Sequence, residues 1–319
     1  METSEINTSG GSVSKVNANH AYVGIVLIWA TTPLAVKWSN SSLSFISAVS
    51  LRMVLALIFC LVILLILRRP LVRSAGDWRV FFAGSISLFP SMLLVYWSAQ
   101  YVPSGLISVV LAVYPFMVGV FSILLLKENM FTKNRVVALI VAILGLALVQ
   151  RGQLHVSGTD AVLGIVGLLI ASAVFAFSTV WMKSLARDVE PLQQTTGSLL
   201  LSVPALLLTW YYWDGLHIGV IDDKSLFSML YLAVVGSVLG GILFFKVLTH
   251  CRVSSVGLIT LLTPVAALVI GAVFNDEKIE GLSLVGCIIV MLALAIYQNI
   301  FRFNYQALLR FIPLSGKAG

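Results

Sequence analysis

Long apolar runs constrain the fold of this chain more than any other feature of its sequence. A helix needs about 20 apolar residues to cross the hydrocarbon core of a bilayer, and ten such runs follow one another along the chain. We therefore predict an all-α membrane protein with ten transmembrane helices. The predicted spans are residues 21–39, 43–67, 78–99, 102–126, 134–149, 161–182, 191–213, 226–248, 254–274 and 281–301.

The composition excludes the classes of soluble protein. Hydrophobic residues make up 59% of the 319 residues and charged residues only 10%, whereas a soluble domain is about 45–50% apolar and about 25% charged. A soluble enzyme, a disordered chain and a nucleic-acid-binding domain are therefore excluded. The lipid bilayer is the first partner that the sequence predicts.

Basic residues predict the orientation. With the N-terminus in the cytoplasm, 15 of the 20 Lys and Arg residues fall in cytoplasmic segments, four fall on the opposite side, and Arg52 lies within a span. This bias predicts that both termini are cytoplasmic. Residues 1–19 are polar and lack the apolar core of a signal peptide, so we expect a disordered cytoplasmic tail there and a second cytoplasmic tail at 302–319.

The chain contains an internal repeat. Pro115 lies 13 residues before Glu128, and Pro264 lies 13 residues before Glu277, so one offset of 149 aligns both pairs. The first span of each half matches as well, because Trp29-Ala30 precedes Lys37 with the spacing at which Phe175-Ala176 precedes Lys183. We predict two five-span repeats, 20–150 and 160–301. Since five is odd, the second repeat enters the membrane from the opposite side.

Inverted repeats are typical of secondary transporters, whose binding site lies between the repeats near the midplane. The alternative is a duplication that was kept for packing alone. Pro33, Pro115 and Pro264 each predict a helix kink. Matched kinks in the two halves favour irregular backbone beside a cavity, although proline is also common in ordinary membrane helices.

Arg52 is the charged residue deepest within a predicted span, roughly 13 Å from its outer end at 1.5 Å per residue. Every Asp and Glu maps to a tail, a loop or a span end, so no carboxylate partner is apparent. Arg52 either binds backbone carbonyls or engages a substrate carboxylate. Glu128 and Glu277 end their helices, where they either pack against loops or act as gate latches.

Several kinds of chemistry lack their motifs. The sequence contains no phosphate-binding loop for ATP, no GxSxG or HExxH motif, and no cluster of His and Cys. We therefore predict no enzyme activity, no metal and no cofactor, and we interpret the three cysteines as buried apolar residues. Without a midplane carboxylate to relay ions, facilitated export down a gradient is favoured.

The two halves, the Pro-to-Glu spacing and the Trp-Ala…Lys start resemble the EamA-type branch of the drug/metabolite transporter superfamily. The resemblance covers nearly all of 20–301. It implies a ten-span inner-membrane carrier, often an exporter of amino acids or other small metabolites. It also implies a central cavity lined by the regions of Trp29, Tyr96, Tyr114, Phe175, Lys246 and Thr263. Related carriers of phosphorylated sugars have basic residues in the last span, and this chain has none there.

The sequence therefore predicts a secondary transporter that exports an amino acid or similar small metabolite by alternating access, with Arg52 engaging an anionic group of the substrate. A lipid-carrier flippase is the second hypothesis and requires a lateral opening between helices. A third, from another class, is an intramembrane enzyme or a non-transporting scaffold. The sequence predicts no particular oligomeric state.

Overall fold

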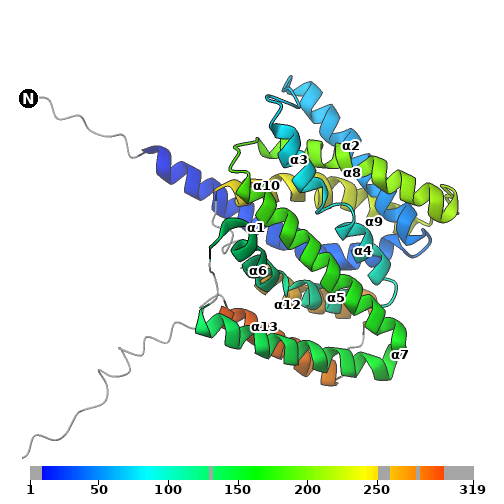
Figure 1. Cartoon of the computed structure of the whole chain (residues 1–319). Coiled ribbons are helices and arrows are strands. Elements are labelled where there is room, and N and C mark those ends of the chain that lie inside the picture. The colour runs from blue at the N-terminus through cyan, green and yellow to red at the C-terminus, as the bar shows by residue number, and fades with distance from the viewer. Residues whose placement is uncertain (1–8, 129–131, 251–258, 278–280, 298–319) are drawn as a thin grey trace, which may run out of the picture.

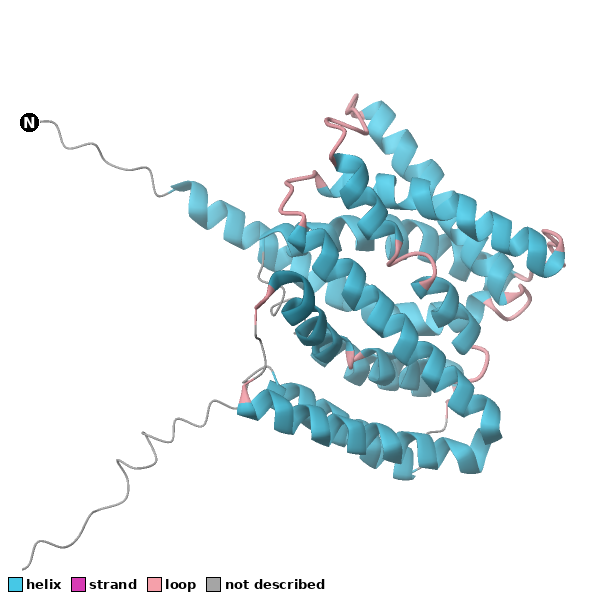
Figure 2. Ribbon diagram, viewed as in Figure 1, coloured by secondary structure: helices cyan, strands magenta, loops and turns pink. Residues whose placement is uncertain are grey.

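The computed structural model describes residues 9–128, 132–250, 259–277 and 281–297, and this part of the chain is helical without strands. Short loops join most of the helices (Figure 2). The helices are α1 (Ser9–Ser39), α2 (Phe45–Ile66), α3 (Asp77–Ser85), α4 (Ser91–Ser98), α5 (Ser104–Leu111), α6 (Tyr114–Leu126), α7 (Lys133–Ser184), α8 (Pro191–Asp214), α9 (Asp223–Tyr231), the π-helix η1 (Leu232–Leu239), α10 (Gly240–His250), α12 (Ile259–Asn275) and α13 (Gly281–Tyr297).

Four helical stretches among these residues are long and apolar enough to cross a bilayer, namely Phe45–Ile66, Ser104–Leu126, Asp160–Ser184 and Asp223–Thr249. Three shorter apolar helices accompany them, Val23–Ser39, Ala266–Asn275 and Gly281–Tyr297. Many large apolar side chains on these helices are exposed. Such a surface suits contact with lipid and not with water.

The helices pack as a bundle around α1. Helix α1 contacts α12, α10 and α9, while α2 packs on α8 and η1. Helix α13 lies along one arm of α7 (Figure 1). Gly145 and Gly286 meet there, because a Cβ atom built on Gly286 would lie 2.6 Å from the Gly145 carbonyl oxygen. Small residues allow this close approach of two helices in a membrane.

Helix α7 differs from the sequence prediction. Its 52 residues join the predicted fifth and sixth spans without a loop. A straight helix of this length would measure about 78 Å, but α7 bends sharply into two arms (Figure 1). The first arm packs on α13. The second arm packs on α4, where Ser91 donates a hydrogen bond to the Ala171 carbonyl at 2.9 Å. The joint between these predicted spans is therefore helical.

Two predicted spans are each built from two short helices. The predicted span 78–99 is divided into α3 and α4 by a turn that contains the cis peptide Phe89–Pro90. The predicted span 102–126 is divided into α5 and α6, and α6 begins one residue before Pro115. Proline has no amide hydrogen to donate to the preceding turn, so each break lies beside a proline. Pro33 and Pro264 lie inside α1 and α12.

The N-terminal part also differs from the prediction. Helix α1 begins at Ser9, within the segment 1–19 that we expected to be a disordered tail. Extending an existing helix adds one hydrogen bond per ordered residue, so α1 continues beyond the apolar residues that the sequence analysis recognised. Residues 1–8 and the predicted C-terminal tail 302–319 lie outside the described residues.

Candidate binding site

Two cavities lie next to each other inside the bundle and share the lining residues Trp29, Thr32, Met92 and Phe175. We name them the arginine chamber and the hydroxyl chamber. The arginine chamber has a volume of about 80 Å³, and Arg52, Thr195, Gly236, Ser237, Phe244 and Phe245 also line it. The hydroxyl chamber has a volume of about 120 Å³, and Ser91, Ser108, Tyr114, Ser172 and Thr263 also line it.

Arg52 of α2 provides the positive charge of the arginine chamber. Its side chain is buried, with 3% of the residue exposed. The guanidinium donates from Nε to Ser237 Oγ at 2.8 Å and from Nη1 to Tyr96 Oη at 3.2 Å. Its Cζ atom also lies 5.8 Å from the centroid of the Tyr96 ring, which adds a cation–π contact. These contacts orient the guanidinium without neutralising its charge.

The π-helix η1 makes room for this guanidinium. A Cβ atom built on Gly236 would lie 3.1 Å from Nη2 of Arg52, so a glycine lets the backbone approach closely. The next residue, Ser237, accepts the Nε hydrogen bond. π-Helical turns are frequent at functional sites because they change which side chains face a cavity. Here the turn brings two small residues to the arginine.

Arg52 has no carboxylate partner within the described part of the chain. The ion pairs found there join Arg69, Arg73 and Arg187 to Glu190 and Asp77. A guanidinium has five N–H donors, and Arg52 makes two hydrogen bonds. A buried arginine that retains its charge and spare donors beside a cavity can bind a carboxylate with two hydrogen bonds.

An aromatic cluster separates the two chambers. Trp29 of α1 stacks on Phe244 of α10 with ring centroids 5.6 Å apart and meets Phe175 of α7 edge-on at 6.0 Å. Phe175 also contacts Tyr114, with centroids 5.2 Å apart. Four helices therefore contribute aromatic rings at the centre of the bundle. Such a lining suits an apolar or zwitterionic ligand.

The hydroxyl chamber contains a polar atom that the described part of the chain leaves without a partner. The hydroxyl of Ser172 is buried and makes no hydrogen bond within the described residues. Ser91 differs, because it donates to the Ala171 carbonyl. Buried polar atoms nearly always have a partner in the protein or in solvent. The chamber therefore offers hydrogen bonds to a small polar group.

Most of the residues that the sequence predicted for binding lie at these chambers. Five of the seven line one or both of them: Trp29, Arg52, Tyr114, Phe175 and Thr263. Tyr96 lies behind Arg52 as its hydrogen-bond partner. Lys246 lines neither chamber, because the preceding Phe244 and Phe245 present their side chains there and each helical residue turns by about 100°. Pro33, at which the sequence predicted a kink, also lines the hydroxyl chamber.

The analysis of the sequence missed Ser237, Thr195 and Phe244. Serine, threonine and phenylalanine are ordinary in apolar helices, so their residue types gave no signal. Gly236, whose backbone lies close to the Arg52 guanidinium, did give a signal in the sequence. A glycine within a helix often marks a close contact with a neighbouring group.

Glu277 joins the two halves at one end of the bundle. Its carboxylate accepts hydrogen bonds from the amides of Ser104 and Gly105 at 3.0 and 3.2 Å, and from the Ser104 hydroxyl at 2.9 Å. Asn275 donates to the same carboxylate at 3.0 Å. The negative charge therefore caps the N-terminus of α5, where the helix dipole favours it. This network fastens the end of α12 to the start of α5.

A vestibule of about 530 Å³ lies at the opposite end of the bundle, and Lys183, Arg187 and Gln194 contribute to its lining. Phe245 lines both this vestibule and the arginine chamber. One aromatic residue thus borders both spaces.

The carboxylate of Asp77 lies beside the vestibule. Hydrogen bonds from Ser74 are the main cause of the lowered pKa of Asp77, and the nearby charge of Arg187 lowers this pKa further.

Each half of the chain makes an equivalent lysine contact. Lys37 donates to the carbonyl of Val102 at 3.2 Å, and Lys183 donates to the carbonyl of Leu248 at 2.9 Å. Both pairs are separated by 65 residues. The contacts lie at opposite ends of the bundle, since Lys37 is close enough to Glu277 to interact electrostatically and Lys183 lines the vestibule.

The backbone around Glu128 has the same local conformation as the backbone around Glu277. Lys127 and Asp276, the residues before them, have positive φ angles of 56° and 49°. The amide of Glu128 donates to the Ser122 carbonyl at 3.3 Å, and the amide of Glu277 donates to the Gly271 carbonyl at 3.2 Å. The segment 253–254, which is equivalent to Ser104 and Gly105 by the offset of 149, lies outside the described residues.

The sequence matches the EamA-like transporter family over residues 20–151 and again over residues 162–297. The chain belongs to this family. It is therefore a membrane transporter and not an enzyme, as the sequence predicted. A solved crystal structure shares the EamA-like fold of this chain, with a TM-score of 0.66 over 88% of this chain and 96% of its own, at 14% identity.

Two of the following three relatives of this EamA-like protein are named as a transporter or an efflux pump. It is 25% identical to the uncharacterized transporter YvbV of Bacillus subtilis, over 75% of this chain and 78% of that protein. It is 27% identical to protein PecM of Dickeya dadantii, over 76% and 80% of the two chains. It is also 26% identical to a protein of Escherichia coli named "probable amino-acid metabolite efflux pump", over 64% and 70%.

Proposed function

We propose that this EamA-like transporter exports an amino acid or a similarly small carboxylate by alternating access. The single observation that carries the proposal is Arg52, a buried arginine that lines a cavity and has no carboxylate partner within the described residues. Burying a charge without a counter-ion is costly. A substrate carboxylate would supply the missing charge and use the spare guanidinium donors.

The substrate class agrees with the rest of the site. Each chamber is smaller than the roughly 300–1,000 Å³ of a pocket for a drug-sized ligand, which favours a compact cargo. The aromatic cluster of Trp29, Phe175 and Phe244 suits an apolar side chain beside the carboxylate. The name of the Escherichia coli relative points to the same class of compound.

The proposed architecture is ten spans arranged as two inverted halves. Two observations support it: the family matches twice along the chain, and Lys37 and Lys183 make contacts of equal sequence spacing. The charges of the loops favour a position in the inner membrane with both termini in the cytoplasm. In that orientation the vestibule opens to the cytoplasm and Glu277 lies at the outer end.

In this mechanism the two ends of the bundle open and close in turn, so that the substrate cavity is accessible from one side of the membrane at a time. The hydrogen bonds of Glu277 to the start of α5 support closure of the outer end. The vestibule next to Phe245 supports access from the cytoplasm. By the symmetry of the repeats, Glu128 takes the role of Glu277 when the cytoplasmic end closes. The carrier then releases its cargo outside, down the gradient of that cargo.

The test is counterflow of radiolabelled amino acids into liposomes that contain the purified protein. We expect at least one amino acid to accumulate, and we expect the amine that lacks its carboxylate not to compete. Arg52→Gln should raise the half-saturation concentration by roughly 10–100-fold, because a hydrogen bond to a charged group contributes about 1.5–3 kcal/mol.

Arg135→Gln is the matched control. Arg135 also lies over a tyrosine ring, 5.0 Å from the centroid of Tyr297, but it lines neither chamber. This variant should transport normally. Unchanged transport by Arg52→Gln, with the thermal unfolding of both variants intact, would refute carboxylate binding at Arg52.

A further inference from the structure

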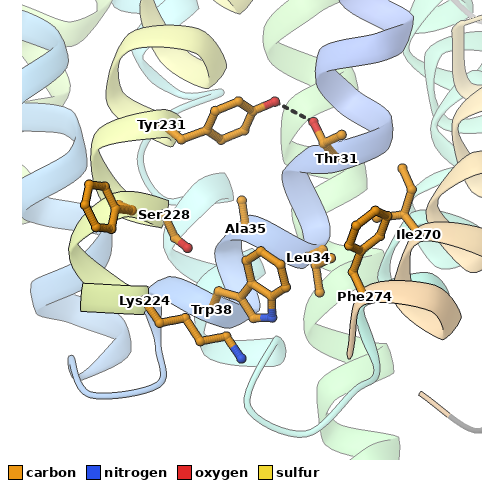
Figure 3. Close-up of a pocket in the computed structure, with 10 residues that line it drawn as sticks. Thr31, Leu34, Ala35, Trp38, Lys224, Ser228, Tyr231, Ile270 and Phe274 are labelled. Atoms are coloured by element: carbon orange, nitrogen blue, oxygen red, sulfur yellow. Dashed lines mark hydrogen bonds between the residues drawn. The ribbon is translucent and has the colours of Figure 1, made fainter. Parts of the chain in front are cut away.

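A groove of about 500 Å³ opens on the outside of the bundle between α1, α9 and α12 (Figure 3). Its walls are apolar, with Leu34 and Ala35 of α1 facing Ile270 and Phe274 of α12. Phe227 also lines the groove. The exposed fraction is 68% for Phe227 and 65% for Phe274. In a membrane-embedded protein such a surface faces acyl chains.

The groove has one cationic end. Lys224 lines it there, and its Nζ lies 4.9 Å from the centroid of the Trp38 ring. Among the described residues that line the groove, Lys224 is the only lysine or arginine, and none is an aspartate or glutamate. Lysine and tryptophan at one level of a transmembrane helix are typical of the interface between hydrocarbon and headgroups. A phosphate at this level would meet the ammonium group.

The opposite end of the groove is closed by a hydrogen bond. The hydroxyls of Thr31 and Tyr231 are 2.6 Å apart and connect α1 to α9 (Figure 3). Thr31 lies seven residues from Trp38, and Tyr231 lies seven residues from Lys224, so the groove extends roughly 10 Å along both helices. One leaflet of the hydrocarbon core is about 15 Å thick. The groove therefore has the length of a partly inserted acyl chain.

We propose that this groove binds one phospholipid, with its phosphate at Lys224 and an acyl chain lying between α1, α9 and α12 as far as the Thr31–Tyr231 bond. Lys224 supplies the charge that complements a phosphodiester, and the apolar walls supply the surface for the chain. The adjacent residue Thr32 lines both internal chambers. The bound lipid thus supports the face of α1 opposite the substrate cavity.

Native mass spectrometry of the purified protein tests the proposal. Delipidated protein is titrated with a phosphatidylglycerol, a phosphatidylethanolamine and a diacylglycerol that have the same acyl chains. We expect one tightly retained molecule of either phospholipid and a several-fold weaker retention of the diacylglycerol. Lys224→Gln should lower the apparent affinity about fivefold, because a basic residue near the membrane surface contributes about 1 kcal/mol.

Lys133→Gln removes an exposed lysine far from the groove and should bind phospholipid like the wild type. A phospholipid with brominated acyl chains adds a second measurement, since it should quench Trp38 and lose that part of the quenching in Trp38→Phe. Equal retention of diacylglycerol, or unchanged binding by Lys224→Gln, would overturn the proposal. Neither measurement requires transport, so failure here leaves the Arg52 proposal standing, and the converse also holds.

Discussion

At the scale of single residues, Arg52 could be predicted from the sequence and its surroundings could not. A charge in the middle of an apolar run is costly, so its position alone marks a candidate site. Its partner Ser237 lies 185 residues further along the chain, and a serine in an apolar helix is unremarkable. Lys246 shows the opposite case. The sequence marked its charge as a candidate for the cavity, but which residues of α10 face the cavity depends on how the helix is rotated about its axis, and Phe244 and Phe245 face it instead.

Gly236→Ala should impair transport without changing any charge. The added methyl group would lie 3.1 Å from Nη2 of Arg52, so the guanidinium must move by a few tenths of an ångström from the position in which Nε donates to Ser237. We expect the half-saturation concentration of the transported amino acid to rise several-fold in the liposome assay. Alanine itself favours a helix over glycine, so a loss of helix stability would not explain the result.

Gly281→Ala provides the control for this prediction. A Cβ atom at Gly281 meets nothing within 4 Å, and the residue begins α13, away from both chambers. Transport by this variant should equal that of the wild type. If Gly236→Ala also behaves like the wild type, the close approach of η1 does not position Arg52.

At the scale of elements, apolar length predicted where helices lie but not where they break. The interruption between α5 and α6 was foreseeable, because Pro115 lacks an amide donor. The π-helix η1 has no comparable residue signal, since it depends on how neighbouring helices pack. The polar residues 150–160 did mark the joint between the two arms of α7, but not that this joint is helical. Helix caps supplied from distant segments are equally hidden, as Glu277 and Ser104 are 173 residues apart.

Glu277→Gln should loosen the start of α5. The variant keeps the size of the side chain but loses the negative charge that the amides of Ser104 and Gly105 favour. We expect faster hydrogen exchange in peptides that cover α5 and a lower unfolding temperature. Glu190→Gln, which removes an ion pair with Arg73 at the other end of the bundle, should leave the exchange of α5 unchanged. Equal exchange in both variants would contradict a capping role.

At the scale of the whole molecule, the sequence predicted the membrane class and the transporter family. It did so because apolar length, loop charge and the repeated Pro-to-Glu spacing are properties of the chain itself. The chambers and the vestibule arise from contacts between distant helices. Residues such as Phe245, which borders two of these spaces, acquire their role only in the assembled bundle.

A cysteine at Thr195 should report which end of the bundle is open. Thr195 is buried and lines the arginine chamber. With Cys60, Cys251 and Cys287 replaced by alanine, we expect Thr195→Cys to react with a membrane-impermeant maleimide applied from the vestibule side only. Adding Phe245→Ala should accelerate the reaction, because it removes the ring between vestibule and chamber.

Ser41→Cys serves as the control in the same background, since Ser41 is exposed at the end that contains Glu277. It should react only from that opposite side. Labelling of Thr195→Cys from the side of Ser41 would contradict a closed outer end.

The ring of Phe245 at one end and the carboxylate network of Glu277 at the other also bear on electrical insulation. Under the proposed mechanism, a resting carrier with both barriers in place would interrupt a water column along the described helices. We would then expect many copies to be present in one membrane without dissipating its proton gradient.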